Sequence, residues 1–260
     1  MSDGKSGLQL RSLLKKSGEL ELSLVDIPTP EPADDEVVVR VEAAPINPSD
    51  LALLFGPADL AGADYGDGRV VATMPEPALR AMASRVGEAM TVGNEGAGTV
   101  VAAGEAPEAQ ALLGKLVAAV AGGMFAQYRI ADARACMELP AGITAEQGAS
   151  AFVNPLTALG FVETMRREGH HAIVHTAAAS NLGQMLVRIC REDGVPLVNI
   201  VRNSEQVRLL KDLGAEHVID SSQDGFAAEL VAAVAATKAT IGFDAIGGGK
   251  LAGQILTAME

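Results

Sequence analysis

Residues 172–192 read AIVHTAAASNLGQMLVRICRE, and the architecture of the second half of the chain can be worked out from this stretch. Ala172 to His175 are typical of a buried strand, Leu182 to Glu192 have the length and periodicity of a helix, and a turn connects them. Three further strand–helix pairs follow, at 197–201 and 204–213, 217–220 and 225–237, and 240–245 and 250–259. Strands that alternate with helices in this way form a parallel sheet with right-handed crossovers. The sequence therefore predicts a doubly wound α/β unit.

The turn from Thr176 to Gly183 is a candidate binding element. In a doubly wound sheet the first strand-to-helix turn offers free backbone N–H groups and a positive helix end to a pyrophosphate. The dinucleotide-binding pattern G-x-G-x-x-G is represented here by AASNLG at 178–183, which keeps only the third glycine. Small residues at the first two positions still allow close approach of the backbone to a ligand. The predicted cofactor-binding residues of this turn are Ala178, Ser180, Asn181, Leu182 and Gly183. A strand-to-helix turn that binds nothing is the alternative.

The end of the second strand of this unit indicates which dinucleotide is bound. Arg202 and Asn203 lie there, where an NAD-binding unit has an acid that receives the ribose hydroxyls. An arginine at this place favours a 2′-phosphate instead, because the guanidinium group pairs well with phosphate. Arg202 and Asn203 are therefore predicted to bind NADPH. The alternative for Arg202 is a solvated surface charge.

The first half of the chain has a different pattern. Short strands are expected at 20–25, 36–43, 96–103, 115–120 and 125–130, which predicts a small barrel-like β domain. The apolar run Val37-Val38-Val39-Arg40-Val41 indicates a strand that is buried on both faces. Residues 56–68 hold four glycines and three aspartates and are expected to form a mobile surface loop. Helix starts are predicted at Thr144, which opens a capping box, and at Asn154, an N-cap followed by proline.

Composition and charge narrow the class of protein. The 260 residues are 48% hydrophobic and 20% charged, which is typical of a globular protein with about two domains. The formal net charge of −13 repels phosphate backbones and anionic lipids, so no nucleic acid and no membrane is expected as a partner. No apolar run is long enough to cross a bilayer and no secretory signal is recognisable, so a cytoplasmic location is predicted. Cys136 and Cys190 are expected to be buried thiols, and no spacing typical of metal ligands occurs.

Four motifs of the chain resemble one known family. In order and spacing they are similar to the medium-chain dehydrogenase/reductase superfamily, and closest to its zinc-independent branch, which contains NADPH:quinone oxidoreductases and mitochondrial-type enoyl thioester reductases. The resemblance covers nearly the whole chain. It implies a GroES-like β domain at residues 1–152, on the substrate side, followed by a Rossmann-type NADPH-binding domain at 153–260. The four motifs are Asn47-Pro48-Ser49-Asp50, Gly93-Asn94-Glu95-Gly96-Ala97-Gly98, Asn154-Pro155-Leu156-Thr157-Ala158 and Leu213-Gly214-Ala215-Glu216-His217-Val218-Ile219.

The resemblance also implies that no metal takes part. Zinc-dependent relatives have a cysteine in the segment that corresponds to Asn47 to Asp50, and a histidine directly before the acid that corresponds to Glu95. This chain has no cysteine in that segment and has Asn94 before the acid. By resemblance, Asn47 would line the pocket near the nicotinamide, and Thr157 would contact the carboxamide. A turn-forming asparagine and a threonine at a helix start are the alternatives.

The proton donor separates two kinds of reductase. Enoyl reductases have a tyrosine two residues after the glycine that corresponds to Gly56, and this chain has Ala58 there. Tyr65 is the candidate substitute if its segment folds inward, and a solvent-exposed tyrosine otherwise. A quinone takes protons from water after hydride transfer, so we predict hydride transfer from NADPH to a quinone or conjugated carbonyl. The alternatives are an enoyl thioester reductase and a catalytically silent NADPH-binding protein.

The predicted sheet has fewer strands than the complete fold. Dinucleotide-binding sheets have six strands in the order 3-2-1-4-5-6, and four are predicted here. We therefore expect a truncation at Glu260 that leaves the strand at 240–245 as an unpaired edge, where Ile241 and Phe243 lack neighbours. The 260-residue chain is expected to bind NADPH weakly if at all, to show negligible hydride transfer and to associate or precipitate. A form extended by the two missing strands is expected to be a soluble, active homodimer.

Overall fold

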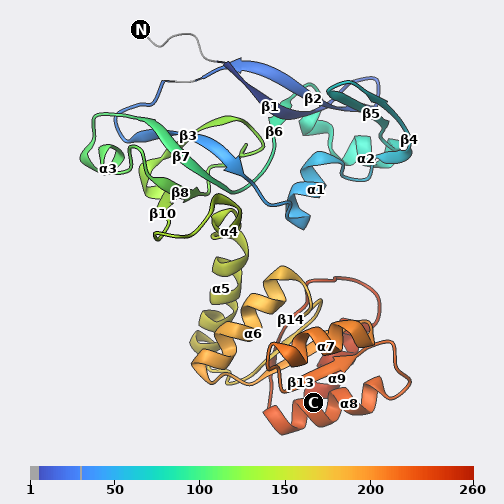
Figure 1. Cartoon of the computed structure of the whole chain (residues 1–260). Helices are drawn as coiled ribbons and strands as arrows, with labels where there is room; N and C mark the ends of the chain where they lie inside the picture. The colour runs from blue at the N-terminus through green and yellow to red at the C-terminus, as the bar shows by residue number, and fades with distance from the viewer. Residues whose placement is uncertain (1–5, 30) are drawn as a thin grey trace. The chain divides into compact units, whose positions relative to one another are not determined.

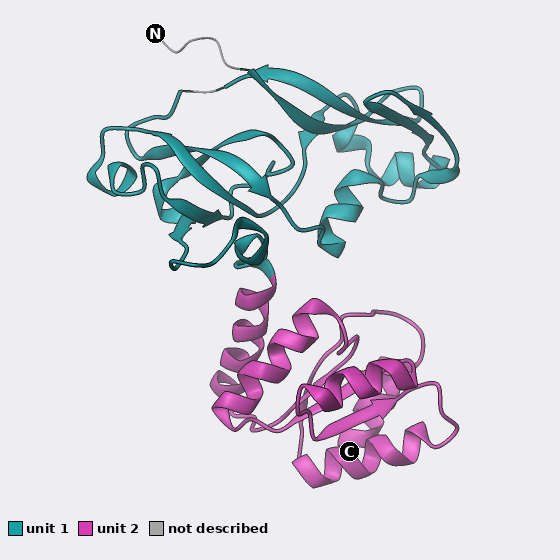
Figure 2. Cartoon of the chain, in the orientation of Figure 1, with its two compact units in different colours: residues 1–153 teal, residues 154–260 magenta. Residues whose placement is uncertain are grey.

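The computed structural model describes residues 6–29 and 31–260. The chain divides into two compact units, Met1–Val153 and Asn154–Glu260 (Figure 2), which are called unit 1 and unit 2 below. Among the described residues, no helix is both long and apolar enough to span a bilayer.

Unit 1 contains two five-stranded sheets, with strand orders β4-β5-β2-β1-β6 and β10-β8-β7-β3-β9 (Figure 1). Its strands are β1 (Ser6–Leu14), β2 (Glu19–Pro28), β3 (Glu36–Ala43), β4 (Asp59–Gly66), β5 (Arg69–Thr73), β6 (Ala89–Thr91), β7 (Gly96–Ala103), β8 (Leu116–Ala119), β9 (Tyr128–Asp132) and β10 (Cys136–Glu138). Its helices are α1 (Pro48–Leu54), α2 (Glu76–Ala81), α3 (Pro107–Gln110) and α4 (Ala145–Gly148), with 3-10 turns at Ala83–Arg85 and Ala133–Ala135.

The second sheet of unit 1 is built around β3. This strand pairs antiparallel with β7 on one side and β9 on the other. Val37, Val38 and Val39 are each 0% exposed, so the strand is buried on both faces as its β-branched run predicts. Both β3 and β7 have the bounds expected from the sequence.

The mobile loop expected at residues 56–68 is wrong, because most of this segment forms a strand. Residues 59–66 form β4, which pairs antiparallel with β5 around the two-residue turn Asp67-Gly68. Seven of the eight residues of β4 are exposed, so the strand has none of the apolar alternation by which half-buried strands are recognised. It is held by backbone pairing, and the Asp-Gly pair is the sequence signal for such a hairpin.

Unit 2 is a parallel sheet with helices on both faces (Figure 1). The strand order is β13-β12-β11-β14, which is the 3-2-1-4 part of the dinucleotide-binding order. The strands are β11 (Ile173–His175), β12 (Leu197–Val201), β13 (His217–Asp220) and β14 (Ile241–Phe243). The helices are α5 (Val153–Arg167), which begins at the last residue of unit 1, α6 (Asn181–Asp193), α7 (Ser204–Asp212), α8 (Phe226–Thr237) and α9 (Leu251–Met259).

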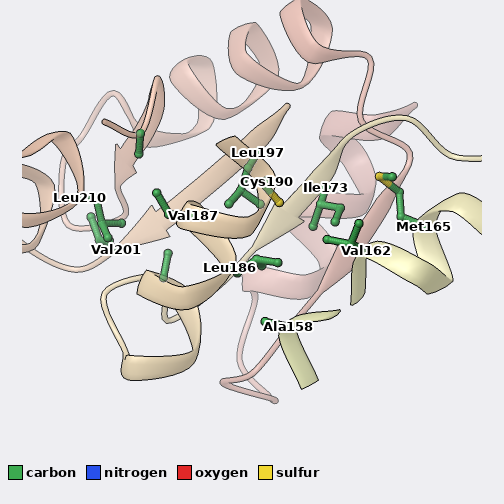
Figure 3. Packing of buried hydrophobic residues seen from close by; sticks show 12 residues of the cluster. Ala158, Val162, Met165, Ile173, Leu186, Val187, Cys190, Leu197, Val201 and Leu210 are labelled. Atoms are coloured by element: carbon green, nitrogen blue, oxygen red, sulfur yellow. The ribbon is translucent and has the colours of Figure 1, made fainter. Parts of the chain in front are cut away.

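Two apolar clusters form the core of unit 2. Residues of α5, α6 and α7 cover one face of the sheet, where Ile173, Leu186 and Leu210 are fully buried (Figure 3). Residues of α8 and α9 cover the other face, around Val174, Val198 and Leu230. The alternation of strand residues between the clusters is what a sheet buried on both faces requires.

One of the two predicted helix starts is confirmed and the other is wrong. The Thr144 side chain accepts a hydrogen bond from the Gln147 N–H and caps α4 as a capping box. Helix α5 begins at Val153, so Asn154 lies inside its first turn and is not the N-cap. The physical reason is that the Glu95 carboxylate accepts hydrogen bonds from the N–H groups of Phe152 and Val153, both at 2.9 Å, and so does what a cap does.

Strand β14 is shorter than the expected strand and pairs, among the described residues, with β11 alone. Ile241 and Phe243 are half-buried, and both pack against the cluster under α6. The Phe243 ring stacks on that of Phe161, with 4.0 Å between the ring centroids. These contacts come from one face of the sheet only.

Candidate functional site

The turn between β11 and α6 ends in a well-formed helix cap. The side chain of Ser180, the N-cap of α6, accepts a hydrogen bond from the Gly183 N–H at 3.2 Å. The Ser180 N–H in turn donates to the Ala177 carbonyl at 2.9 Å. Ala177 has φ of 50°, a left-handed conformation that is unusual for a residue with a side chain. The sequence is locally suited to this turn because serine caps helices well.

Two backbone N–H groups at the start of α6 make no hydrogen bond to the described residues. Within residues 6–29 and 31–260, no acceptor bonds to the N–H groups of Asn181 and Leu182. The first N–H groups of any helix have no intrahelical partner, and together with the helix dipole they attract an anion. This end of α6 therefore has the properties of a phosphate-binding site.

Gly183 is required by packing and not by the ligand. A Cβ on this residue would overlap the carbonyl oxygen of Ala178, so the helix sits directly against the turn. Close packing of helix and strand is the purpose that the third glycine of the dinucleotide pattern serves. Ala178 itself is 0% exposed and packs in the core.

A cavity of about 360 Å³ joins the turn to the end of β12. It brings together two of the predicted cofactor-binding residues, Ser180 and Arg202. Of the remaining predicted residues in unit 2, Ala178, Asn181, Leu182, Gly183 and Asn203 do not line it. The lining residues are Ala177, Ala179, Ser180, Val201, Arg202, Gln206 and Ile246.

The backbone of Arg202 is hydrogen-bonded, whereas its side chain is exposed to solvent. Its N–H donates to the Gln206 side-chain oxygen at 2.9 Å, and the Gln206 N–H donates to the Asn203 side chain, also at 2.9 Å. Asn203 is thus the N-cap of α7. The Arg202 side chain is exposed, and its guanidinium has no hydrogen-bond or ionic partner among the residues that the structure describes. Gln206 was not predicted, although its capping-box spacing from Asn203 is readable in the sequence.

In unit 1, the two motifs 47–50 and 93–96 lock together. Asp50 accepts hydrogen bonds from the Asn47 N–H at 2.8 Å and the Asn94 N–H at 3.0 Å. The Asn47 amide donates to the Glu95 carboxylate at 3.0 Å, and the Asn94 amide donates to the Ser49 hydroxyl at 3.0 Å. Asn47, Asp50 and Glu95 are at most 4% exposed. Each motif therefore satisfies the buried polar groups of the other.

The segment 47–50 and Asn94, where the resemblance implies zinc ligands in zinc-dependent relatives, hold amide, hydroxyl and carboxylate groups that bond to protein partners. Within the described ranges, no group of three or more His, Cys, Asp or Glu side chains is placed to hold a metal ion. Cys190 is buried and Cys136 half-buried. Burial raises the pKa of the Cys190 thiol to about 12 and that of Cys136 to about 11, so both are neutral near pH 7.

The remaining predicted residues lie in different units. Tyr65, on β4 of unit 1, is 67% exposed and donates its hydroxyl to the Leu60 carbonyl at 3.0 Å. Ala58, where the resemblance implies a tyrosine in enoyl reductases, packs against the apolar cluster of Leu14, Leu20 and Met74. Thr157 is an exposed residue of α5. The roles suggested for Tyr65 and Thr157 stay predictions.

Known proteins resemble the chain over nearly its full length. Residues 33–141 match the model of the alcohol dehydrogenase GroES-like domain. A crystal structure assigned as an NADPH:quinone reductase from Mesorhizobium loti is 32% identical, with a TM-score of 0.74, and the match covers 98% of this chain and 72% of that one. The mitochondrial enoyl-[acyl-carrier-protein] reductase of Xenopus tropicalis is 31% identical over 230 residues, 84% of this chain and 58% of that protein. A mycobacterial protein in complex with NADPH shares the fold, with a TM-score of 0.68 at 22% identity, over 95% of this chain and 70% of that one.

A GroES-like unit followed by a Rossmann-type parallel sheet defines a class of two-domain, dinucleotide-binding proteins. The chain belongs to the medium-chain dehydrogenase/reductase superfamily, in its zinc-independent branch. It spans about half the length of the curated relatives it matches, 58% for the Xenopus tropicalis enzyme and 46% for the human one.

Proposed function

We propose that this protein transfers hydride from NADPH to a quinone or conjugated carbonyl without a catalytic metal. The observation that carries the proposal is the cavity of unit 2, because the turn before α6 lines it together with Arg202, whose guanidinium has no partner among the described residues. The names of the relatives support the same class of reaction, since they include a quinone reductase and enoyl reductases.

The residues present fit a phosphorylated dinucleotide. The open N–H groups of Asn181 and Leu182 are suited to the pyrophosphate, and Arg202 is suited to the 2′-phosphate. Among the described residues that line this cavity, none is a carboxylate that would repel a phosphate or pair with the arginine. When bound, NADPH supplies the hydride, and the chain's own contribution is to bind and orient it. The roles of Asn47 and Thr157 near the nicotinamide are proposed on the family resemblance.

An enoyl thioester reductase is the second candidate. The curated relatives that favour it include the mitochondrial enoyl-[acyl-carrier-protein] reductases of Xenopus tropicalis and human. Such an enzyme needs a proton donor, and Ala58 at the usual place has no acidic proton. Tyr65 is the proposed substitute, and it would first have to exchange its bond to the Leu60 carbonyl for one to substrate. A quinone acceptor places no such demand on the protein.

The test is NADPH oxidation by the purified protein with a panel of quinones and enones and, separately, with a crotonyl thioester. Turnover of the panel without turnover of the thioester supports the first candidate, and the reverse result supports the second. NADPH binding with neither turnover would identify a catalytically silent binding protein. Activity that survives chelation, with no stoichiometric zinc in a metal analysis, is expected for either reductase. A homodimeric full-length form stays a prediction.

A further inference from the structure

Thr176 and Asp244 join the ends of two neighbouring parallel strands, β11 and β14. The Thr176 hydroxyl donates to the Asp244 Oδ1 at 2.7 Å and accepts the Ala245 N–H at 2.8 Å. The same Oδ1 accepts the Ile246 N–H at 3.0 Å. The Thr176 side chain is 0% exposed, whereas its partner Asp244 is exposed. We call this arrangement the Thr176–Asp244 clasp.

The clasp holds two walls of the cavity in unit 2. Ala177 follows Thr176 directly, and Ile246 bonds to Asp244, and both of these residues line the cavity beside Arg202. Hydrogen bonds to a charged group are stronger than those between neutral groups. The hydrogen bond from Thr176 lowers the pKa of the Asp244 carboxyl, in keeping with a bond to its ionised form.

The turn has a particular need for such support. The first two glycine positions of the dinucleotide pattern hold Ala178 and Ser180, and the residue before them is Ala177. None of these three residues has the freedom of glycine to adopt left-handed conformations. Ala177 nevertheless has φ of 50°, and a residue with a side chain holds this conformation only when its surroundings impose it. The N–H of the preceding Thr176, which donates to the Phe243 carbonyl at 3.3 Å, and the bonded Thr176 hydroxyl are part of those surroundings.

We propose that Thr176 and Asp244 are positioning residues for NADPH, which set the spacing between the phosphate-binding turn and the segment after β14. This inference rests on the proposed function, because it names residues that act on the same cofactor. Neither side chain has to touch the cofactor. Both act through Ala177 and Ile246.

The experiment compares Thr176→Val, which keeps the shape and removes the hydroxyl, with Thr176→Ser, which keeps the hydroxyl. Thr237→Val is the matched control, because the Thr237 hydroxyl bonds within α8, to the Ala233 carbonyl at 2.8 Å. The readouts are the NADPH dissociation constant and the hydrogen exchange of the Ala245 and Ile246 amides. Thr176→Val should weaken NADPH binding about tenfold or more and speed both exchanges. Thr176→Ser should stay within about threefold of the unchanged protein, and Thr237→Val should alter neither readout.

The possible outcomes test the existence of the clasp, its positioning role and the proposed function separately. Unchanged exchange in Thr176→Val would overturn the clasp itself, whatever NADPH does. Faster exchange with unchanged NADPH affinity would overturn the positioning role. If Thr176→Val does not fold, Asp244→Asn replaces it, and that variant must also weaken NADPH binding if the proposal is right. Failure of the unchanged protein to bind NADPH would refute the proposed function, while the exchange data would still report on the clasp.

Discussion

In unit 1 the Glu95 carboxylate accepts hydrogen bonds from three protein donors, whereas in unit 2 the Arg202 guanidinium meets no hydrogen-bond or ionic partner among the described residues. Both residues belong to sequence patterns that pointed to function. The difference shows that the motifs of unit 1 are first of all folding elements, because their polar groups are buried against one another. Among the described residues, Arg202 and the start of α6 leave donors open, which is the state a ligand requires. Changes in unit 1 should therefore lower stability, and changes around the unit 2 cavity should lower affinity.

The largest effect is expected for Glu95→Ala. The substitution removes a carboxylate that is 1% exposed and accepts hydrogen bonds from the Asn47 amide and from the N–H groups of Phe152 and Val153. Hydrogen bonds to charged groups contribute about 1.5–3 kcal/mol each, so the free energy of unfolding should fall by roughly 3–5 kcal/mol. Urea unfolding measures this. Glu88→Ala, at an exposed glutamate of unit 1, is the control and should change little. Equal stability of the two variants would contradict the role given to Glu95.

Gly183→Ala should have the next largest effect. It should lower both the stability of the protein and its affinity for NADPH. The new Cβ meets the Ala178 carbonyl, so either α6 or the turn must move. Forcing a methyl group into a packed site costs about 1–3 kcal/mol, and the displaced N–H groups of α6 should bind NADPH more weakly. Gly160→Ala on α5 is the matched control, because a Cβ there meets nothing within 4 Å. Alanine favours helix, so the control should gain up to about 1 kcal/mol. Similar stability losses in both variants would contradict this account.

Much of the fold is predictable because its signals are local. Strands β3 and β7 have the predicted bounds, and the four strand–helix pairs of unit 2 appear in the predicted order. Strand β1 was missed because its pattern is inverted: Gln9 and Ser12 are buried, while Leu8 is 42% exposed. Partners far along the chain satisfy these polar groups, for instance the Leu53 carbonyl that accepts from the Ser12 hydroxyl at 3.0 Å. No local pattern reports such a partner.

Of the candidate site, too, one part could be predicted from the sequence and another part could not. Ser180 and Arg202 could be found because a parallel sheet brings the ends of its strands to one edge. Ile246 and the Thr176–Asp244 clasp could not, because they depend on which strand lies beside β11 and on the course of the chain after β14. The bonds between the motifs 47–50 and 93–96 were likewise not predicted, since they join segments more than 40 residues apart.

Arg202→Ala should affect affinity alone. The guanidinium has no partner to lose among residues 6–29 and 31–260, so the free energy of unfolding should change by less than about 0.5 kcal/mol. NADPH affinity should fall roughly 10- to 150-fold, because a charge-assisted phosphate contact contributes about 1.5–3 kcal/mol, and NADH affinity should hardly change. Fluorescence titration with both cofactors measures this. Arg208→Ala, at an exposed arginine of α7, is the control. Equal affinity of the unchanged protein for the two cofactors would refute the assignment of Arg202.

The smallest expected effect is a pH dependence of stability that arises from His175. It belongs to unit 2, where all four histidines of the chain lie. His175 is 0% exposed, its Nδ1 lies 3.1 Å from the Phe243 carbonyl oxygen, and its Nε2 has no partner among the described residues. Burial lowers the pKa of this imidazole below its ordinary value of 6.5. The unfolded chain then binds a proton at a higher pH than the folded one, so the stability contribution of neutral His175 is complete above pH 6.5 and falls as the pH drops towards the folded pKa.

Urea unfolding followed between pH 7.5 and about pH 5 should show this loss, and His175→Asn, which keeps a donor for the Phe243 carbonyl, should flatten the profile. A profile that is identical in the two proteins would show that another group causes the pH dependence.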